Sequence, residues 1–227
     1  MSVIEISCMG VRPSLDIMDE STREGQILRK VWDTVTTDPG GPHRVYWGLE
    51  NDESSKLWTF FDWDSIEDHE HYAKMLGPAA VKDLPTILNR GFFTKHITVA
   101  PSPPSALRSP MTDIIRAYFA CDIAITDKDL AAAQIRLFLE DKLRHCPTAE
   151  GLSCGWSVEN DLPVLGGPEG QTGSMLIAFI GWRSVAANKQ FWADEGLQEL
   201  ESLFQGMEGM IQWVKFHIHC RSLARDL

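Results

Sequence analysis

The stretch VYWGLENDES, residues 45–54, returns later in the chain as CGWSVENDLP, residues 154–163. In both stretches an apolar run ends in Glu-Asn-Asp, and the two Glu-Asn-Asp triplets stand 109 positions apart. The opening VIEIS around Glu5 matches TDIIR around Asp113 at a spacing of 108. A nearly constant spacing between distant matching segments predicts an internal repeat of one structural unit.

The spacing increases in the second part of the repeat. FFDWDS matches FIGWRS with Trp63 and Trp182 119 positions apart, and TKHITV matches VKFHIH with Lys95 and Lys215 120 positions apart. The increase from 109 to 119 indicates an insertion of about ten residues in the second copy. The segment LPVLGGPEGQTG provides it, and its glycines and prolines predict a loop between two strands.

A proline-rich segment, APSPPSALRSP at 100–110, separates the two copies and is typical of an extended linker. We therefore divide the chain into an N-terminal repeat of residues 1–100, a linker of residues 101–110 and a C-terminal repeat of residues 111–227.

Periodicity predicts the same order of elements, β-α-β-β-α-β, in each copy. The first copy is expected to contain strands over 3–11, 43–50, 56–63 and 92–99, a helix over 20–36, a helix from Ser65 and a short helix opened by Pro78. The second copy is expected to contain strands near 113–122, 152–159, 174–182 and 210–220, and helices near 128–144 and 184–205. A sheet with helices on one face leaves its other face apolar, so two such units are expected to cover each other. The chain would then be a pseudo-dimer in itself, with further association into a homodimer left open.

Composition limits which binding partners and which cellular compartment can be expected. The 227 residues are 44% hydrophobic, enough for a buried core, and carry a formal net charge of −11. This charge argues against nucleic acid or an anionic membrane as a partner. The five cysteines are widely spaced and form no CxxC pair, and the sequence shows neither a signal peptide nor an apolar segment of about 20 residues. We expect a cytoplasmic protein.

The repeat resembles the dimeric α/β-barrel superfamily, whose members include antibiotic-biosynthesis monooxygenases, stress-responsive barrel proteins and olivetolic acid cyclase. The resemblance rests on VYWG at 45–48, on the WDSIE run that leads to Tyr72, and on RGFFTK at 90–95. It covers nearly all of residues 1–100 and, more faintly, residues 111–222. It implies an α+β fold in which two ferredoxin-like repeats pack their antiparallel sheets as an intramolecular barrel. Because the family catalyses many reactions on this scaffold, the fold does not identify the reaction.

In the cyclase-like members of this family, the pocket lies between each sheet and its own helices. A helix tyrosine and a pair of histidines perform acid–base chemistry there. Tyr72 meets the tyrosine position. The histidine positions are not met, because Glu5 stands on the first strand and Ala79 and Ala80 stand on the short helix. His96, at a strand position that is apolar in the cyclase-like pattern, is the expected substitute for the missing base.

The stretch WDSIEDHEHY at 63–72 resembles a metal-binding segment, but helical geometry separates its two histidines. With Ser65 as N-cap, His69 and Tyr72 fall on the stripe that faces the sheet. His71 is rotated by roughly 200° from His69 and is expected in solvent. The two histidines therefore cannot share a metal, and we expect neither a metal nor a cofactor.

Strand alternation sorts the remaining candidates onto the face of the sheet that its helices cover. The catalytic candidates are Glu5, His69, Tyr72 and His96, and the substrate-binding candidates are Ser7, Trp47, Phe61, Trp63 and Thr98. Each has a structural alternative, since a buried histidine or tyrosine is often simply a hydrogen-bonded core residue. Glu5 is harder to explain in this way, because an unpaired buried carboxylate is costly.

The matching pocket of the second copy is expected to be more apolar. Its predicted members are Asp113, Ala178, Ile180, Trp182, Asn188, Phe191, Phe216 and Ile218. It lacks both histidines and the tyrosine, so we expect chemistry in the first copy only. His217 and His219 share one strand face, but no third ligand accompanies them in sequence.

Three functions remain open. The first is a cofactor-free enzyme of natural-product biosynthesis that cyclises or isomerises an apolar polyketide- or terpenoid-like substrate, including by a pericyclic step, with His69 or His96 as base and Tyr72 bonding an oxyanion. The second is a cofactor-independent monooxygenase, in which the same base makes a phenolate or enolate that reacts with O2. The third is a non-catalytic lipophile-binding or stress-response protein.

Overall fold

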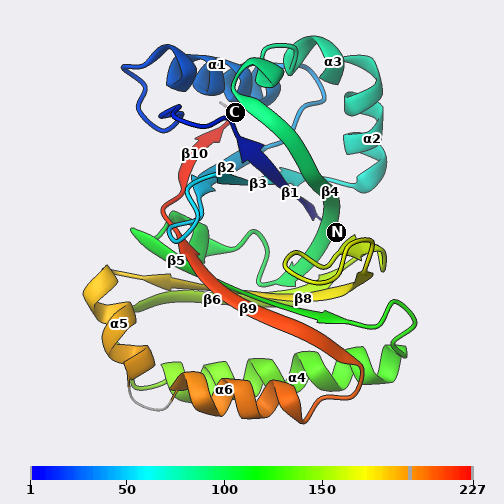
Figure 1. Ribbon diagram of the computed structural model, residues 1–227, viewed down its shortest axis with the longest axis vertical. Helices are drawn as coiled ribbons and strands as arrows, with labels where there is room; N and C mark the ends of the chain where they lie inside the picture. Colours follow the sequence, from blue (N-terminus) through cyan, green and yellow to red (C-terminus); the bar gives the residue numbers. More distant parts are fainter. Residues whose placement is uncertain (1, 194–195, 226–227) are drawn as a thin grey trace. The chain divides into compact units, whose positions relative to one another are not determined.

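The computed structural model describes residues 2–193 and 196–225, which form two compact units. Unit 1 consists of residues 1–96 and 219–227, and unit 2 of residues 97–218 (Figure 1). The sequence-based division placed its boundaries at residues 100 and 111 instead. The difference has two sources: strand β4 contributes its first part to unit 1 and its end to unit 2, and the C-terminal strand pairs within unit 1.

Unit 1 has the predicted β-α-β-β-α-β order. Its elements are β1 (Val3–Val11), α1 (Arg23–Thr37), β2 (Arg44–Leu49), β3 (Lys56–Trp63), α2 (Ile66–Met75), α3 (Gly77–Ala80), the 3-10 turn η1 (Leu84–Thr86), β4 (Leu88–Ala100) and β10 (Arg221–Ala224). The sheet order is β10-β2-β3-β1-β4. Strands β1 and β3 run antiparallel, and Glu5 pairs with Phe61.

The helices α1, α2 and α3 cover one face of this sheet (Figure 1). Helix α1 buries Leu28, Val31, Trp32 and Val35 at helical spacing, and these side chains pack with the odd-numbered residues of β1, β2 and β3. The strand alternation predicted from the sequence is therefore confirmed in this core. Any polar side chain at an odd-numbered position of β1 must lie among these apolar groups.

Unit 2 has the same order of elements. Its elements are β5 (Met111–Phe119), α4 (Ile125–Leu143), β6 (Ala149–Ser157), β7 (Leu162–Pro163), β8 (Thr172–Trp182), α5 (Val185–Ala193), α6 (Gly196–Gln205) and β9 (Met210–Ile218). The sheet order is β4-β6-β8-β5-β9, and the short β7 pairs with β8. Helices α4, α5 and α6 lie on one face of it (Figure 1). The predicted α+β class is confirmed in both units.

Two predicted elements differ from the structure. The helix expected over 184–205 is described as α5 and α6, and residues 194–195 lie outside the described part of the chain. The strand expected over 210–220 ends at Ile218, and a separate strand, β10, follows it. Strand β10 pairs antiparallel with β2, so residues 221–224 contribute to the sheet of unit 1.

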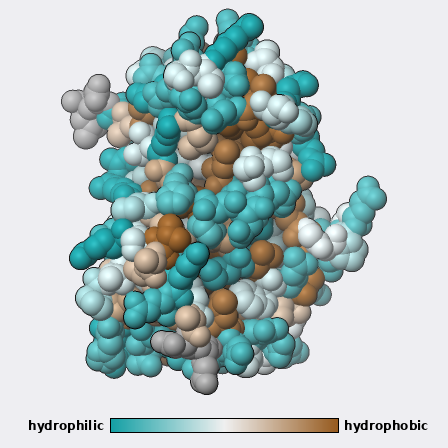
Figure 2. Space-filling view, turned by 60° about the vertical axis from the view of Figure 1, so that its left-hand side comes forward, coloured by the Kyte–Doolittle hydropathy of each residue, from teal (hydrophilic) through white to brown (hydrophobic). Residues whose placement is uncertain are grey.

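The face of the molecule seen in Figure 2 is mostly hydrophilic, with hydrophobic residues reaching the surface in small patches. Within the described residues, no helix has the length and apolar character needed to cross a membrane.

Candidate functional site

Helix α2 carries two of the candidate residues and is positioned by a local cap. Ser65 is its N-cap, and the Ser65 Oγ accepts a hydrogen bond from the Asp68 backbone N–H at 3.1 Å. From this start the helix turns Tyr72 into the core, where it is 5% exposed, and places His69 at the same inner face. His71 is exposed, as its helical position predicts.

A cavity of about 360 Å³ lies between α1, α2, α3 and the sheet of unit 1. Its walls are largely aromatic, and its polar groups come from Glu5, His69, Tyr72 and Thr94. The residues that line it are Glu5, Trp32, Val35, Phe61, Trp63, His69, Tyr72, Ala73, Gly77, Pro78, Val81 and Thr94. An apolar cavity with a few polar groups at its wall is the usual form of a small-molecule site.

Three side chains can donate to the carboxylate of Glu5: Trp63 on β3, His69 on α2 and Ser7 on β1. Its Oε2 accepts from the Trp63 Nε1–H at 3.0 Å and lies 3.2 Å from the His69 Nε2. Its Oε1 lies 3.3 Å from the Ser7 Oγ, whose single proton is also within reach of the Thr94 Oγ1 at 2.9 Å. A histidine therefore pairs with this buried carboxylate.

Burial controls the ionisation of Glu5. The side chain is 10% exposed, and removal from water disfavours the charged form. This desolvation raises the pKa of Glu5 from 4.5 to about 7, although the hydrogen bond from Trp63, the charge of His96 and the hydrogen bond from Ser7 act in the opposite direction. A carboxyl group with a pKa near 7 can accept or release a proton at neutral pH.

The two histidines extend this contact into a chain. The His69 Nδ1 lies 2.8 Å from the Nε2 of His96, which is 6% exposed. When Glu5 is ionised, His69 must carry its proton on Nε2 to donate to the carboxylate, so its Nδ1 accepts from the His96 Nε2–H. The His69 Nδ1 and the His96 Nε2 face each other and do not converge on one point where a metal ion could bind. Throughout the described residues, no group of three His, Cys, Asp or Glu side chains is arranged to hold a metal ion.

Tyr72 lines the same cavity but pairs with a residue that the sequence did not indicate. The Tyr72 hydroxyl donates to the Asp38 Oδ2 at 2.9 Å. Burial, and then this hydrogen bond, raise the pKa of Tyr72 above its ordinary value, so the phenol stays protonated at neutral pH. Arg225 donates to the backbone carbonyls of Thr36, Asp38 and Gly41 and so fixes the loop that carries Asp38.

The other candidates divide between the cavity and its surroundings. Phe61 and Trp63 line the cavity. Ser7 is buried next to Glu5 on β1, and Trp47 is a core residue; neither lines the cavity. Thr98 is exposed and does not line the cavity.

Thr94, two residues before His96 on the same face of β4, is a cavity residue that the sequence reasoning omitted, although strand alternation identifies it. Trp32 and Asp38 were also missed. Trp32 shares the buried face of α1 with Leu28 and Val35, but no local pattern indicates the contact of Asp38 with Tyr72.

Unit 2 holds a carboxylate at the position that matches Glu5, in a fully packed environment. Asp113 is completely buried, and its Oδ2 accepts from Trp182 Nε1 at 2.9 Å, Trp192 Nε1 at 2.6 Å and the amide of Asn188. The Lys215 Nζ lies 3.5 Å from its other oxygen. A buried carboxylate with this many donors is well satisfied as a structural group.

The expectation that Phe216 takes the place of His96 in unit 2 is wrong. In the register of β5 and β9, Phe216 pairs with Ile114 and Lys215 with Ile115. Lys215 therefore shares a face with Asp113, while Phe216 lies on the opposite face, under the guanidinium of Arg116. A shift of one residue moves a side chain to the other face of a sheet, so Lys215, and not Phe216, lies on the face that carries Asp113.

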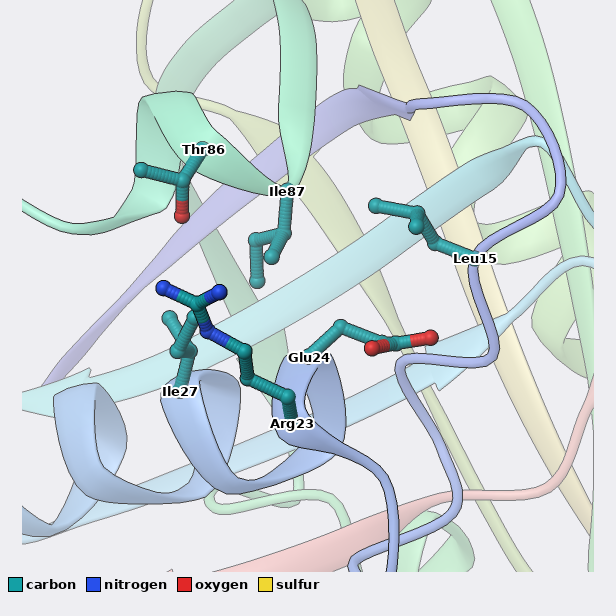
Figure 3. Close-up of a pocket in the computed structure, with 6 residues that line it drawn as sticks. All are labelled: Leu15, Arg23, Glu24, Ile27, Thr86 and Ile87. Carbon is teal, nitrogen blue, oxygen red and sulfur yellow. The ribbon is translucent and has the colours of Figure 1, made fainter.

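Figure 3 shows a second cavity of unit 1, of about 300 Å³, at the start of α1. The Arg23 guanidinium extends toward Thr86 and Ile87, while the Glu24 carboxylate turns toward Leu15. Glu24 already accepts a hydrogen bond from the Asp16 backbone N–H at 3.2 Å. This cavity has neither aromatic walls nor a histidine, so the cavity beside Glu5 is the stronger candidate for chemistry.

Comparison with known proteins identifies the fold and no close relative. No family model matches the chain, and no curated protein matches it. Among solved structures, an anthrone oxidase-like protein has a TM-score of 0.65 and 13% identity, covering 99% of this chain and 93% of its own.

A candidate monooxygenase from Fusobacterium nucleatum has a TM-score of 0.64 and 7% identity, with 99% and 94% covered. Another, from Lactobacillus acidophilus, has a TM-score of 0.59 and 8% identity, with 99% and 96% covered. The similarity spans both units and confirms the α+β fold expected from the resemblance.

Proposed function

We propose that this chain is a cofactor-free enzyme that removes a proton from an apolar aromatic or polyketide-like substrate in the cavity of unit 1. The observation that carries the proposal is Glu5, a buried carboxyl group with a pKa of about 7 at the wall of an aromatic cavity. Perturbed carboxyl groups of this kind are typical of general bases. The flat rings around it suit a flat substrate with an acidic O–H or C–H group.

Glu5 is the base in this proposal, and the histidines position it. Its Oε2 is occupied by Trp63 and His69, whereas its Oε1 has only the longer contact with Ser7 and so has capacity for a substrate proton. Both ring nitrogens of His69 are engaged, one by Glu5 and one by His96. This assignment reverses the expectation that His69 or His96 is the base. The histidine pair fixes the carboxylate and stabilises its charged form.

Tyr72 has a different task from that of a base. Its proton is held by Asp38, which leaves an oxygen lone pair free to accept a hydrogen bond from a substrate hydroxyl. To bond a developing oxyanion, the hydroxyl must turn from Asp38 to the substrate. In both arrangements Tyr72 orients the substrate oxygen while Glu5 takes the proton.

Oxygenation is the first candidate for the fate of the resulting anion. The solved structures that share the fold include candidate monooxygenases and an anthrone oxidase-like protein, which supports this choice. Anthrone illustrates the balance: deprotonation of its methylene carbon gives an enolate, and reaction with one O2 gives anthraquinone and one water.

Cyclisation or isomerisation is the second candidate, and the pKa of Glu5 is compatible with it. A group that titrates near pH 7 can return the proton to a different atom of the same substrate. No O2 is consumed in that case.

Proton abstraction is tested first, without oxygen. Anthrone under argon in D2O serves as the probe, and exchange of its methylene protons is followed by NMR at pH 7. We expect the protein to accelerate exchange, and Glu5→Gln to reduce the acceleration by about 10²-fold or more. Glu50→Gln is the matched control, because Glu50 is a buried carboxylate that accepts from the Trp58 Nε1–H at 3.2 Å and does not line the cavity. Exchange at the buffer rate, or an equal loss in both variants, would contradict the proposal.

Oxygen uptake then separates the two candidates. With anthrone in air, an oxygenase consumes one O2 for each anthraquinone formed. Exchange without O2 uptake above the buffer rate would support cyclisation or isomerisation instead. Tyr72→Phe should weaken probe binding more than it slows exchange of bound probe, because Tyr72 orients the substrate.

A further inference from the structure

The cavity at the start of α1, shown in Figure 3, is lined by two opposite charges that do not pair with each other. Helix α1 begins at Arg23, so Arg23 and Glu24 stand four and three residues before Ile27. Side chains at these spacings are neighbours on the surface of a helix, and both charges therefore flank Ile27. Within the described residues, Arg23 has neither a hydrogen bond nor an ion pair, although a carboxylate follows it directly in the sequence.

The other arginines of this region are already engaged. The Arg29 and Arg221 guanidinium groups lie 3.5 Å and 2.8 Å from the Glu20 carboxylate. Arg12 donates to a backbone carbonyl of η1 at 3.0 Å. Of these four arginines, Arg23 is the one whose guanidinium remains available to a ligand in the part of the chain that the structure describes.

One end of the cavity offers a donor to an anion. Figure 3 shows the Arg23 guanidinium extended toward Thr86. The Thr86 hydroxyl donates to the Asp83 carbonyl at 2.6 Å, so its proton is already used. An anionic group bound at this end would therefore meet Arg23 as its donor.

The other end offers an acceptor to a cation. The Glu24 carboxylate turns away from the guanidinium, toward Leu15 (Figure 3). Its Oε1 accepts from the Asp16 backbone N–H at 3.2 Å, whereas its Oε2 has no partner among the described residues. Apart from Thr86, the rest of the wall is apolar and consists of Leu15, Ile27 and Ile87.

We propose that this cavity binds a small dipolar molecule with a carboxylate at one end, an ammonium group at the other and a short hydrocarbon chain between them, the class of the ω-amino acids. Arg23 binds the carboxylate, Glu24 binds the ammonium group, and the apolar wall covers the chain. A simple carboxylate leaves Glu24 unpaired and a simple amine leaves Arg23 unpaired, so the two charges together select the dipolar ligand. The proposal does not rest on the proposed function, because none of the residues that line this cavity lines the one beside Glu5.

The site is tested by binding of 6-aminohexanoate, hexanoate and hexylamine, which share one carbon chain and differ in their charged ends. Each probe is titrated into the ¹⁵N-labelled protein at low salt, and the backbone amide shifts of Glu24 and Ile87 report binding. Because exposed ion pairs are weak, 6-aminohexanoate should bind only roughly threefold more tightly than either other probe, and added salt should reduce this preference.

Three results would overturn the proposal. The first is equal affinity for all three probes. The second is tightest binding of hexylamine, which would report only the attraction of cations to an acidic protein. The third is the absence of a shift at both amides up to about 50 mM probe.

Variants assign the two ends of the ligand. Arg23→Gln should remove the preference over hexylamine, and Glu24→Gln should remove the preference over hexanoate. Arg29→Gln is the matched control and should retain both preferences, because Arg29 lies on the same helix, pairs with Glu20 and does not line the cavity. Preferences that persist in Arg23→Gln and Glu24→Gln, or that are lost equally in Arg29→Gln, would refute the assignment.

Filling the cavity provides a test that does not change its charges. Ile27→Phe should abolish binding of all three probes, and Leu15→Phe provides the same test if Ile27→Phe does not fold. Binding that persists in both variants would place the ligand elsewhere and refute the proposal. Glu5→Gln should leave all three affinities unchanged, so failure of this proposal and failure of the proposed function are distinguishable.

Discussion

The raised pKa of Glu5 predicts that this residue makes the protein less stable at neutral and alkaline pH than at acidic pH. Its pKa rises from 4.5 in the unfolded chain to about 7 in the folded state, a difference of about 2.5. At about 1.36 kcal/mol for each pKa unit, the folded state loses about 3 kcal/mol relative to the unfolded state when Glu5 ionises. The unfolded chain releases the proton first, so the free energy of unfolding falls as the pH rises from about 4.5 to about 7 and this contribution is constant above that window.

Glu5→Gln removes this titration. Protonated Glu5 and glutamine are similar in shape and charge, so the variant and the wild type should have similar stability at pH 4. At pH 9 the variant should be the more stable by about 3 kcal/mol, while its proton-exchange activity is lost. Urea unfolding followed by tryptophan fluorescence between pH 4 and pH 9 measures the difference in the free energy of unfolding.

The combined result identifies a residue kept for chemistry at a cost in stability. Two observations would refute the reasoning: parallel stability profiles of the wild type and Glu5→Gln across this pH range, or a variant less stable than the wild type at pH 9. Glu50→Gln shows what the loss of the charge from a buried Glu–Trp pair does by itself.

Three further predictions follow from other contacts. His96→Ala removes a charge that lowers the pKa of Glu5, so the pH midpoint of proton exchange should move upward, and an unchanged midpoint would exclude a positioning role. Arg225→Ala loses its side-chain bonds to three carbonyls in the last turn of α1 and the loop after it. It should lower the free energy of unfolding by about 2 kcal/mol, measured in urea, with Arg225→Lys recovering part of it. Ser65→Ala removes the N-cap of α2 and should cost about 1 kcal/mol in the same assay, whereas Ser65→Asp should cost less.

The local sequence pattern was sufficient to predict the helices and strands of unit 1 and the face on which each of their side chains lies. The cap at Ser65, the inward stripe of His69 and Tyr72, and the alternation along β1 and β3 follow from the fixed geometry of helices and strands. These rules also place Glu5 with His69 on the helix-covered face of the sheet. The two Glu-Asn-Asp stretches stand at corresponding places in the order of elements of the two units.

The sequence pattern alone could not assign a side chain to one face of the sheet where strand register decides that face. The match of TKHITV with VKFHIH pairs Lys95 with Lys215. In the sheet of unit 2, however, Lys215 lies beside Asp113. In unit 1 the residue beside the Glu5 cluster is His96, one position after Lys95. Sequence similarity within an apolar strand tolerates a shift of one residue, whereas a sheet does not, because each such shift exchanges its two faces.

The sequence by itself determined that the chain contains two β-α-β-β-α-β units and which residues of the first unit face its helices. Only the tertiary structure decided what those residues can do. Glu5 becomes a candidate base through desolvation, and Tyr72 is bound by Asp38 through a loop that Arg225 holds from the other end of the chain. Periodicity is a property of neighbouring residues, whereas desolvation and hydrogen bonding depend on every group that the fold brings near, however distant in sequence.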